Sequence, residues 1–372
     1  MKVCGIIVEY NPFHNGHIHH IKKAREITKC DILVAVMSGN FVQRGEPAII
    51  DKWKRSEFAI KNGVDIVFEL PYIYSTQSAS KFARGAINIL KRANIDFLVF
   101  GSETNNLAEL QEMAELSINP DNIKEKLDQG YSYPKSYGLL TSHMGPNDIL
   151  AVSYLKEIKD SKIVPYTIKR TINYHDLVIT DKYASASAIR NAIMLKNPIN
   201  NVTTMNDVIN TSYHNYLHNY FLIIKHSLIT LSSKKIKNIF LFSEGIENHL
   251  KKHALMCSDF YDFIKSATTR RYTSSRIRRC CIQLINNIEK KDVDSFPSIF
   301  PLRPLAINDN GKHYLKLLKE KEISVAGKFS HLPEKYREIE YKTTLVYSLF
   351  MNKQEKEDLL KKERGGTLYF KS

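Results

Sequence analysis

Short apolar segments alternate with helical patterns through the first 200 residues of this 372-residue chain. Four segments are too continuously apolar for strands with one face in water, and indicate strands that are buried on both faces: VCGIIVEY (3–10), DILVAVMSG (31–39), VDIVFELP (64–71) and IDFLVFGSE (95–103). The spacers at 14–29, 53–63 and 78–93 have helical spacing. This alternation predicts right-handed βαβ units and a Rossmann-like parallel sheet. The loops after the first and fourth strands would then share the carboxyl edge, where open α/β sheets bind ligands.

Beyond about residue 200 the pattern becomes mostly helical. Helical spacing is found in residues 215–231, 248–267, 274–290 and 357–363. KEISVAG (321–327) reads as a strand, and the proline-punctuated PSIFPLRPL (297–305) as a linker or turn. We therefore predict an α/β catalytic domain over residues 1–200 and a mostly helical domain over residues 201–372.

Positive charge is concentrated in the second half of the chain. The formal net charge is +15, with 25 Lys and Arg against 21 Asp and Glu in residues 1–200, and 29 against 18 in residues 201–372. This asymmetry favours a polyanionic partner such as a nucleic acid. The segment TTRRYTSSRIRR (268–279) suits phosphate contacts and base stacking, and its candidate RNA-binding residues are Arg270, Arg271, Tyr272, Arg276, Arg278 and Arg279. A solvated basic helix surface is the alternative.

Cysteine use and hydropathy indicate a cytoplasmic protein. The five cysteines are an odd number and none lies in a C-x-x-C pair, so we expect reduced thiols and no zinc site. No stretch of about 18 apolar residues is present, so no transmembrane helix is expected. The N-terminus reads as a buried strand and not as a signal peptide.

The run EYNPFHNGHIHHI (9–21) contains four histidines. A metal site is disfavoured, because partner ligands at matching spacing are missing. A phosphate site explains more residues: Gly16 allows close backbone approach, and the free N–H groups at the start of the following helix favour an anion. His14 and His17 would lie beside that anion as hydrogen-bond donors or imidazolium cations. For His19 and His20, a solvated position on the helix flank is the alternative.

His14-Asn15-Gly16-His17 resembles the H-x-G-H signature of the nucleotidylyltransferase superfamily, whose members attack the α-phosphate of a nucleoside triphosphate and release pyrophosphate. Ser185-Ala186-Ser187-Ala188-Ile189-Arg190 resembles its second motif, a hydroxyl-rich helix start followed by Arg. Hydroxyls, N–H groups and an Arg can hold the β- and γ-phosphates. An ordinary capped helix is the alternative for this second motif taken alone.

A closer resemblance covers essentially the whole chain. EYNPFHNGH, MSGNFVQRGEPAIIDKWKR (37–55), FGSE (100–103), PNDIL (146–150) and IKR (168–170) together resemble the bacterial tRNA(Met) cytidine acetate ligase family. The resemblance implies a nucleotidylyltransferase fold, activation of acetate by ATP as acetyl-adenylate, and acetyl transfer to the exocyclic amine of the wobble cytidine of elongator tRNA(Met). The implied ATP-binding residues are Ile7, Val8, Glu9, Tyr10, Asn11, Pro12, Phe13, His14, Asn15, Gly16, His17, Ile18, His19, His20, Gly101, Asn147 and Arg170.

These residues divide into roles by their chemistry. We expect His14 and His17 to stabilise charge at the α-phosphate, and Ser185, Ser187 and Arg190 to bind pyrophosphate. Mg²⁺ is expected to bridge the phosphates, although no dedicated carboxylate cage is visible. Arg44 follows the second strand and could bind phosphate or RNA, or simply be a surface loop residue. Glu9 to Phe13 replace the usual turn of the superfamily, which fits a small carboxylate substrate.

Two other functions remain open from sequence. The first is a small-molecule adenylyltransferase of the same superfamily, which would not need the basic helical half. The second is a non-catalytic RNA-binding protein whose H-x-G-H site senses ATP. The sequence specifies neither the oligomeric state nor how one tRNA is selected.

Overall fold

The computed structural model describes residues 1–115, 124–125, 128–129, 144–170, 183–199, 201–212 and 214–371. A seven-stranded sheet runs through it in the order β7-β6-β1-β2-β5-β8-β9. The strands are β1 (Val3–Val8), β2 (Ile32–Ser38), β5 (Ile66–Leu70), β6 (Phe97–Ser102), β7 (Val164–Lys169), β8 (Pro304–Ile307) and β9 (Leu368–Tyr369). A separate two-stranded hairpin consists of β3 (Phe41–Val42) and β4 (Glu46–Pro47).

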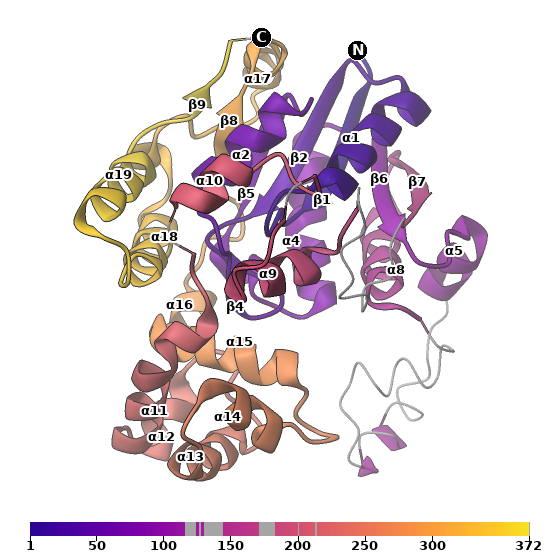
Figure 1. Cartoon of the computed structure of the whole chain (residues 1–372). Helices are drawn as coiled ribbons and strands as arrows, with labels where there is room; N and C mark the ends of the chain where they lie inside the picture. Colours follow the sequence, from indigo (N-terminus) through magenta and orange to yellow (C-terminus); the bar gives the residue numbers. More distant parts are fainter. Residues whose placement is uncertain are drawn as a thin grey trace.

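Helices cover the sheet and also form a layer of their own below it (Figure 1). The helices that precede the lower layer in the chain are α1 (Asn15–Thr28), α2 (Lys52–Lys61), α3 (Tyr72–Ser75), α4 (Ala79–Arg92), α5 (Leu107–Glu115), α8 (Pro146–Ile158), α9 (Ala186–Met194) and α10 (Asn206–Thr211). The lower layer contains α11 (Phe221–Thr230), α12 (Ser233–Asn238), α13 (Ile246–Met256), α14 (Phe260–Ala267), α15 (Ser274–Ile285) and α16 (Lys290–Asp294). The chain ends with α17 (Asp309–Glu320), α18 (Glu334–Tyr347) and α19 (Lys353–Arg364).

The four strands predicted from sequence form the parallel centre of the sheet. β1 pairs with β2 and β6, and β2 pairs with β5, each in parallel. Every residue of β2 and of β5 is buried, as expected for strands covered on both faces. The register aligns Val8 with Met37 and Ser102 with Lys169, so the carboxyl ends of the parallel strands share one edge. The α/β fold with a helical part is therefore confirmed.

The C-terminal part of the chain extends this sheet, which the sequence did not predict. β8 pairs antiparallel with β5, and β9 pairs parallel with β8. The segment 297–305 is thus not only a linker, because Pro304 begins β8, a position where the missing N–H of proline is tolerated. The predicted strand at 321–327 was wrong: Val325 forms an isolated bridge with Leu302 and no ladder follows.

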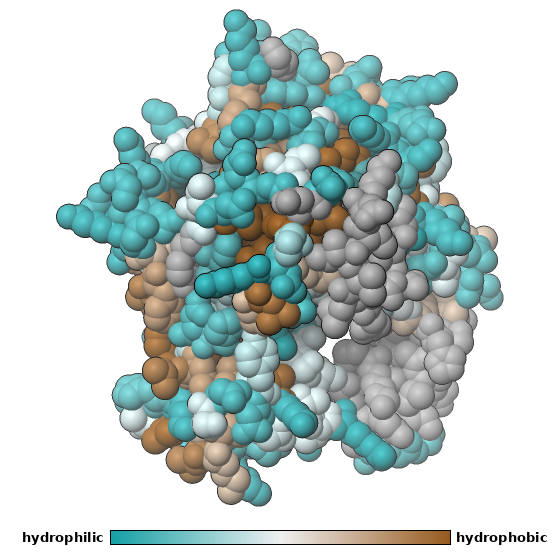
Figure 2. All heavy atoms as spheres, viewed as in Figure 1, coloured by the Kyte–Doolittle hydropathy of each residue, from teal (hydrophilic) through white to brown (hydrophobic). Residues whose placement is uncertain are grey.

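The surface is largely hydrophilic, with hydrophobic side chains exposed over the lower helical layer (Figure 2). Leu222 on α11 is 77 % exposed and Met256 at the end of α13 is 75 % exposed. The five cysteines are buried free thiols. Within the described ranges, no helix is both long and apolar enough to span a bilayer.

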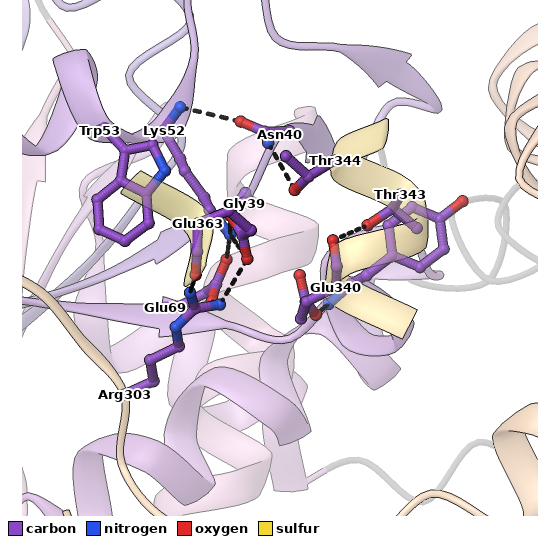
Figure 3. A network of polar contacts seen from close by, with 12 residues as sticks. Gly39, Asn40, Lys52, Trp53, Glu69, Arg303, Glu340, Thr343, Thr344 and Glu363 are labelled. Atoms are coloured by element: carbon purple, nitrogen blue, oxygen red, sulfur yellow. Dashed lines mark hydrogen bonds and ion pairs between the residues drawn. The ribbon is translucent and has the colours of Figure 1, made fainter. Parts of the chain in front are cut away.

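A buried ionic cluster joins the C-terminal segment to the sheet (Figure 3). Lys52 on α2 contacts Glu69 on β5, and its Nζ lies 2.9 Å from Oε2 of Glu363 on α19. Arg303 Nη1 lies 2.6 Å from Glu69 Oε2 and 3.0 Å from Glu363 Oε1. All four side chains are at most 4 % exposed. Two cations therefore face two carboxylates, and the cluster connects segments about 300 residues apart in the chain.

Candidate active site

A cleft lies at the carboxyl edge of the sheet, where β1, β6 and β7 end and α1, α8 and α9 begin. Most of the predicted ATP-binding residues line it: Ile7, Val8, Glu9, Tyr10, Asn11, His14, Gly16, His17, His19, His20, Gly101, Asn147 and Arg170. The predicted phosphate residues Ser185, Ser187 and Arg190 line the same cleft, and so does Arg44. Four of the predicted ATP-binding residues do not line the cleft: Pro12, Phe13, Asn15 and Ile18. The structure thus brings both sequence motifs to one cavity.

His14 and His17 form the start of α1. His14 is the N-cap residue: its Nδ1 accepts a hydrogen bond of 3.0 Å from the backbone N–H of Gly16. His17 Nδ1 in turn accepts from the backbone N–H of His14 at 3.2 Å, which completes a reciprocal capping box. The two rings stack with centroids 3.7 Å apart. Since both Nδ1 atoms accept backbone protons, each neutral ring carries its own proton on Nε2.

Burial keeps these histidines neutral in the ligand-free protein. Desolvation lowers the pKa of His14 to about 3, with Arg170 and Arg190 as further causes. The pKa of His17 is also lowered well below its usual value, by burial first and then by His14. Of the two forms considered from sequence, the neutral Nε2–H donor is therefore favoured over the imidazolium cation. Neutral donors can still stabilise developing negative charge on a phosphate oxygen.

These pKa shifts predict a loss of stability in acid. Burial lowers the pKa of His20 to about 4, although its ring contacts the Val99 carbonyl oxygen at 3.3 Å. Between about pH 6.5 and these lowered values the unfolded chain binds more protons than the folded chain, so the free energy of unfolding falls as the pH falls. We expect His20→Asn to flatten this slope in urea unfolding measured from pH 7 to pH 4. His313→Asn, at an exposed position on α17, is the matched control, and an equal slope in wild type and His20→Asn would contradict the prediction.

The loop between β1 and α1 is fixed by contacts from distant parts of the chain. Asn11 Oδ1 accepts from the backbone N–H of Ile49 at 2.8 Å. Arg190 Nη1 donates to the Asn11 carbonyl oxygen at 2.7 Å, so the Arg of the second motif holds the loop of the first. Thr203 Oγ1 donates to the Phe13 carbonyl oxygen at 2.6 Å. Phe13 is thus fixed in the loop through its backbone, although it does not line the cleft.

Arg55 is a structural residue of this site to which the sequence assigned no role. Its guanidinium is fully buried and donates to four backbone carbonyl oxygens, those of Ile50, Ser38, Gly39 and Glu9. It thereby ties the end of β1 to the end of β2. The WKR segment at the start of α2 was the only signal, and it gave no indication of these partners.

The opposite wall of the cleft is built by reciprocal carboxylate contacts. Asp148 on α8 accepts from the backbone N–H of Glu103 at 3.0 Å and from the Ser102 hydroxyl. Glu103 Oε2 accepts in return from the backbone N–H of Asp148 at 2.9 Å, and Glu103 also binds the Asn147 amide. Arg170 Nη1 donates to Asn147 Oδ1 at 3.3 Å. Sequence reasoning placed Asn147 and Arg170 here but missed the two carboxylates that position them.

Gly101 lies next to Arg170 in this wall. A Cβ at position 101 would be 3.4 Å from Arg170 Cγ, which is ordinary van der Waals contact. The glycine therefore leaves the strand end open toward the cleft, and the space beside it is bounded by the Arg170 side chain. Its φ lies outside the left-handed region, so space and not backbone conformation is the feature that glycine provides here.

The third wall is the start of α9. Ser185 is the N-cap residue, and its Oγ accepts from the backbone N–H of Ala188 at 3.0 Å. Arg190 Nη2 donates to Ser187 Oγ at 3.2 Å, one turn earlier on the same helix. The Ser-x-Ser motif is thus a capped helix start, and this helix start lines the same cleft as the start of α1.

The β3–β4 hairpin carries Arg44 into the cleft and rests directly on basic helix α15. Arg278 on α15 pairs with Glu46, and Arg279 Nη1 donates to the Gln43 carbonyl oxygen at 3.3 Å. Gly45 has a φ of +80°, and a Cβ there would be 2.3 Å from the backbone nitrogen of Arg279. Glycine is therefore required for this close backbone contact.

The rest of the basic segment is partly engaged within the protein. Arg276 Nη1 lies 2.9 Å and Arg271 Nε 3.6 Å from Glu244 Oε2, and Arg270 is exposed. The expectation that Tyr272 stacks on a base is not supported: its side chain is 7 % exposed and its hydroxyl donates to the Glu244 carbonyl oxygen at 2.6 Å. Burial of the ring in the helical layer is the physical reason.

The chain is similar to known proteins over most of its length. A model of the HIGH Nucleotidyl Transferase family matches residues 1–362. The chain is 39 % identical to the tRNA(Met) cytidine acetate ligase of Caldicellulosiruptor bescii over 99 % of this chain and 94 % of the relative. It is 38 % identical to the protein of that name from Staphylococcus aureus, over 86 % of this chain and 87 % of the relative.

Solved structures agree with these sequence matches. The crystal structure of Thermotoga maritima TmcAL in its apo form covers both chains completely with a TM-score of 0.88 and 30 % identity. The same protein bound to alpha-thio ATP matches with a TM-score of 0.86 and 31 % identity over both complete chains. The fold is therefore shared with that protein.

Proposed function

This chain belongs to the HIGH Nucleotidyl Transferase family and, within it, to the tRNA(Met) cytidine acetate ligases, and we propose that it activates acetate with ATP and transfers the acetyl group to the wobble cytidine of elongator tRNA(Met). The observation that carries this proposal is the meeting of two helix starts, His14–His17 and Ser185–Arg190, across one cleft. The product is N4-acetylcytidine, and the reaction forms a carbon–nitrogen bond.

The first step forms acetyl-adenylate. An acetate oxygen attacks the α-phosphorus of ATP, and pyrophosphate leaves with the electron pair of the broken P–O bond. The N-terminal N–H groups of α1 and the Nε2–H groups of His14 and His17 stabilise the charge that develops on the α-phosphate oxygens. Ser185, Ser187 and Arg190 hold the departing pyrophosphate. Such a site needs no protein nucleophile, because positioning and electrostatics carry most of the catalysis.

The wall formed by β6, β7 and α8 receives the adenosine. Asn147 and Arg170 present an amide and a guanidinium to the cleft, and Gly101 leaves room beside them. Mg²⁺ bound together with ATP would neutralise negative charge on the phosphates. In the described part of the chain, no group of three or more His, Cys, Asp or Glu could hold a metal ion.

The second step acetylates the tRNA in the cytoplasm. The cytidine N4 attacks the acyl carbon of acetyl-adenylate, and AMP is the leaving group. We assign tRNA binding to residues 201–372, with the basic segment 268–279 of the lower helical layer as a contact surface. Arg44 lies between this layer and the cleft, so it can contact either the phosphates or the RNA.

Binding of tRNA is expected to weaken steeply with salt. Each phosphate contact contributes about 0.7–0.9 to the slope of log K against log salt concentration. We expect Arg270→Gln together with Arg271→Gln to lower the affinity and reduce this slope by about 1–2. Filter binding from 50 to 200 mM salt measures the affinity and its salt slope, and Lys81→Gln on the exposed face of α4 is the control. Salt-insensitive binding by the wild type would contradict this surface.

One reaction separates the three candidate functions. The protein is incubated with ATP, labelled acetate and elongator tRNA(Met), and label in the RNA and pyrophosphate release are followed. Label in the tRNA supports the ligase. Pyrophosphate release without labelled RNA would support a small-molecule adenylyltransferase, and no turnover would support an ATP-sensing RNA-binding protein.

A further inference from the structure

Glu9 is the one carboxylate among the described residues that line the cleft. It directly follows β1 and is half-buried. Three arginines line the same cavity, Arg44, Arg170 and Arg190. These cations suit a cleft that binds phosphates, but a carboxylate repels the phosphates of ATP. Glu9 therefore calls for a role other than phosphate binding.

The cytidine amine must lose a proton when it becomes an amide. Most other side chains of the cleft that could accept this proton are already engaged with backbone groups. His14 and His17 use Nδ1 to accept backbone protons, so their Nε2 atoms are donors and not acceptors. His20 Nε2 contacts the Val99 carbonyl oxygen. A carboxylate can accept a proton from an amine that is attacking an acyl carbon.

Glu9 lies on the side of the cleft that faces the basic helix. Its Oε1 accepts from the backbone N–H of Gln43 at 2.8 Å. The carbonyl oxygen of that same Gln43 accepts from Arg279 Nη1 on α15 at 3.3 Å. One hairpin residue thus connects the carboxylate in the cleft to the helix of the basic segment.

We propose that Glu9 is the general base of the acetyl-transfer step. N4 of the cytidine forms a bond to the acyl carbon, the bond from that carbon to the phosphate oxygen breaks, and its electron pair leaves with AMP. The Glu9 carboxylate takes the proton from N4, and the backbone N–H of Gln43 holds the carboxylate in place. This inference rests on the proposed ligase function.

The test measures the two half-reactions separately in the full-length protein. Acetate-dependent ATP–pyrophosphate exchange reports adenylation, and a single turnover of preformed enzyme-bound acetyl-adenylate with tRNA reports transfer. We expect Glu9→Gln, which keeps the shape and the Gln43 contact, to slow transfer about 100-fold, and at least about 20-fold more than it slows exchange. Glu26→Gln, on the exposed side of α1, is the matched control.

Three results would overturn the proposal. Equal losses in exchange and transfer would assign Glu9 to the ATP step, for example as a contact to Mg²⁺ or ribose. Transfer within about 3-fold of wild type would remove Glu9 from the chemistry. A weaker tRNA affinity that accounts for the whole loss would make Glu9 a binding residue. A wild-type protein without acetate-dependent exchange would instead contradict the ligase function itself.

Discussion

Replacement of His14 or His17 by alanine will lower acetate-dependent ATP–pyrophosphate exchange by about 100- to 1,000-fold, the usual effect of removing a hydrogen-bond donor from a developing oxyanion. Both Nδ1 atoms are occupied by backbone N–H groups, which leaves the Nε2–H groups for the α-phosphate. The two rings stack with their centroids 3.7 Å apart, so the two imidazoles lie together in the cleft. Isotope exchange between pyrophosphate and ATP measures the effect directly.

A capping defect must be distinguished from the loss of a catalytic donor. His14 caps α1, and losing a helix cap costs about 1 kcal/mol of stability. Asparagine is also a good N-cap residue, so His14→Asn should retain the stability and still lose the exchange activity. His313→Ala, at an exposed position on α17, is the control for loss of a histidine side chain away from the cleft. Near-normal exchange by His14→Asn would remove the imidazole from the mechanism.

Glu363→Ala will destabilise the protein by about 3–5 kcal/mol, the typical cost of breaking a buried ion pair from one side. Burial alone would raise the pKa of Glu363, but Lys52 and Arg303 overcome this effect and hold the pKa below its usual value. Without Glu363, these two buried cations would share only Glu69. Urea unfolding at pH 7 measures the loss.

The cluster also predicts which nearby carboxyl group stays neutral. Burial raises the pKa of Glu340 to about 8, with Glu69 as the next cause, so at pH 7 it is mostly protonated and does not balance the cations.

The matched control for Glu363→Ala is Glu357→Ala, on the exposed side of α19, which also carries Glu363. It should change stability by less than about 0.5 kcal/mol. Equal losses for Glu357→Ala and Glu363→Ala would contradict the account of the cluster.

The central strands could be predicted because their signal is local. β1, β2, β5 and β6 are continuous apolar segments with helical patterns between them. β7 (VPYTIK) escaped notice because it is an edge strand with no fully buried residue. β8 and β9 were missed because their partners are distant: Phe68 pairs with Pro304, and Ala306 with Leu368. No local pattern encodes such a pairing.

The candidate site divides in the same way. The H-x-G-H and Ser-x-Ser motifs are local, since each places its side chains at a helix start through capping. Arg55, Glu103 and Asp148 were missed because their role depends on partners that only the fold brings close. Tyr272 was given a surface role because a sequence does not reveal which face of a helical layer is buried.

The most direct test of the proposed chemistry follows the oxygen atoms of acetate. The protein, ATP and tRNA are incubated with acetate carrying ¹⁸O at both oxygens, and the AMP is analysed by mass spectrometry. If an acetate oxygen attacks the α-phosphorus at the His14–His17 site, each AMP released with an acetylated cytidine carries one ¹⁸O atom in its phosphate. AMP without ¹⁸O, alongside acetylated tRNA, would contradict an acetyl-adenylate and with it the central claim.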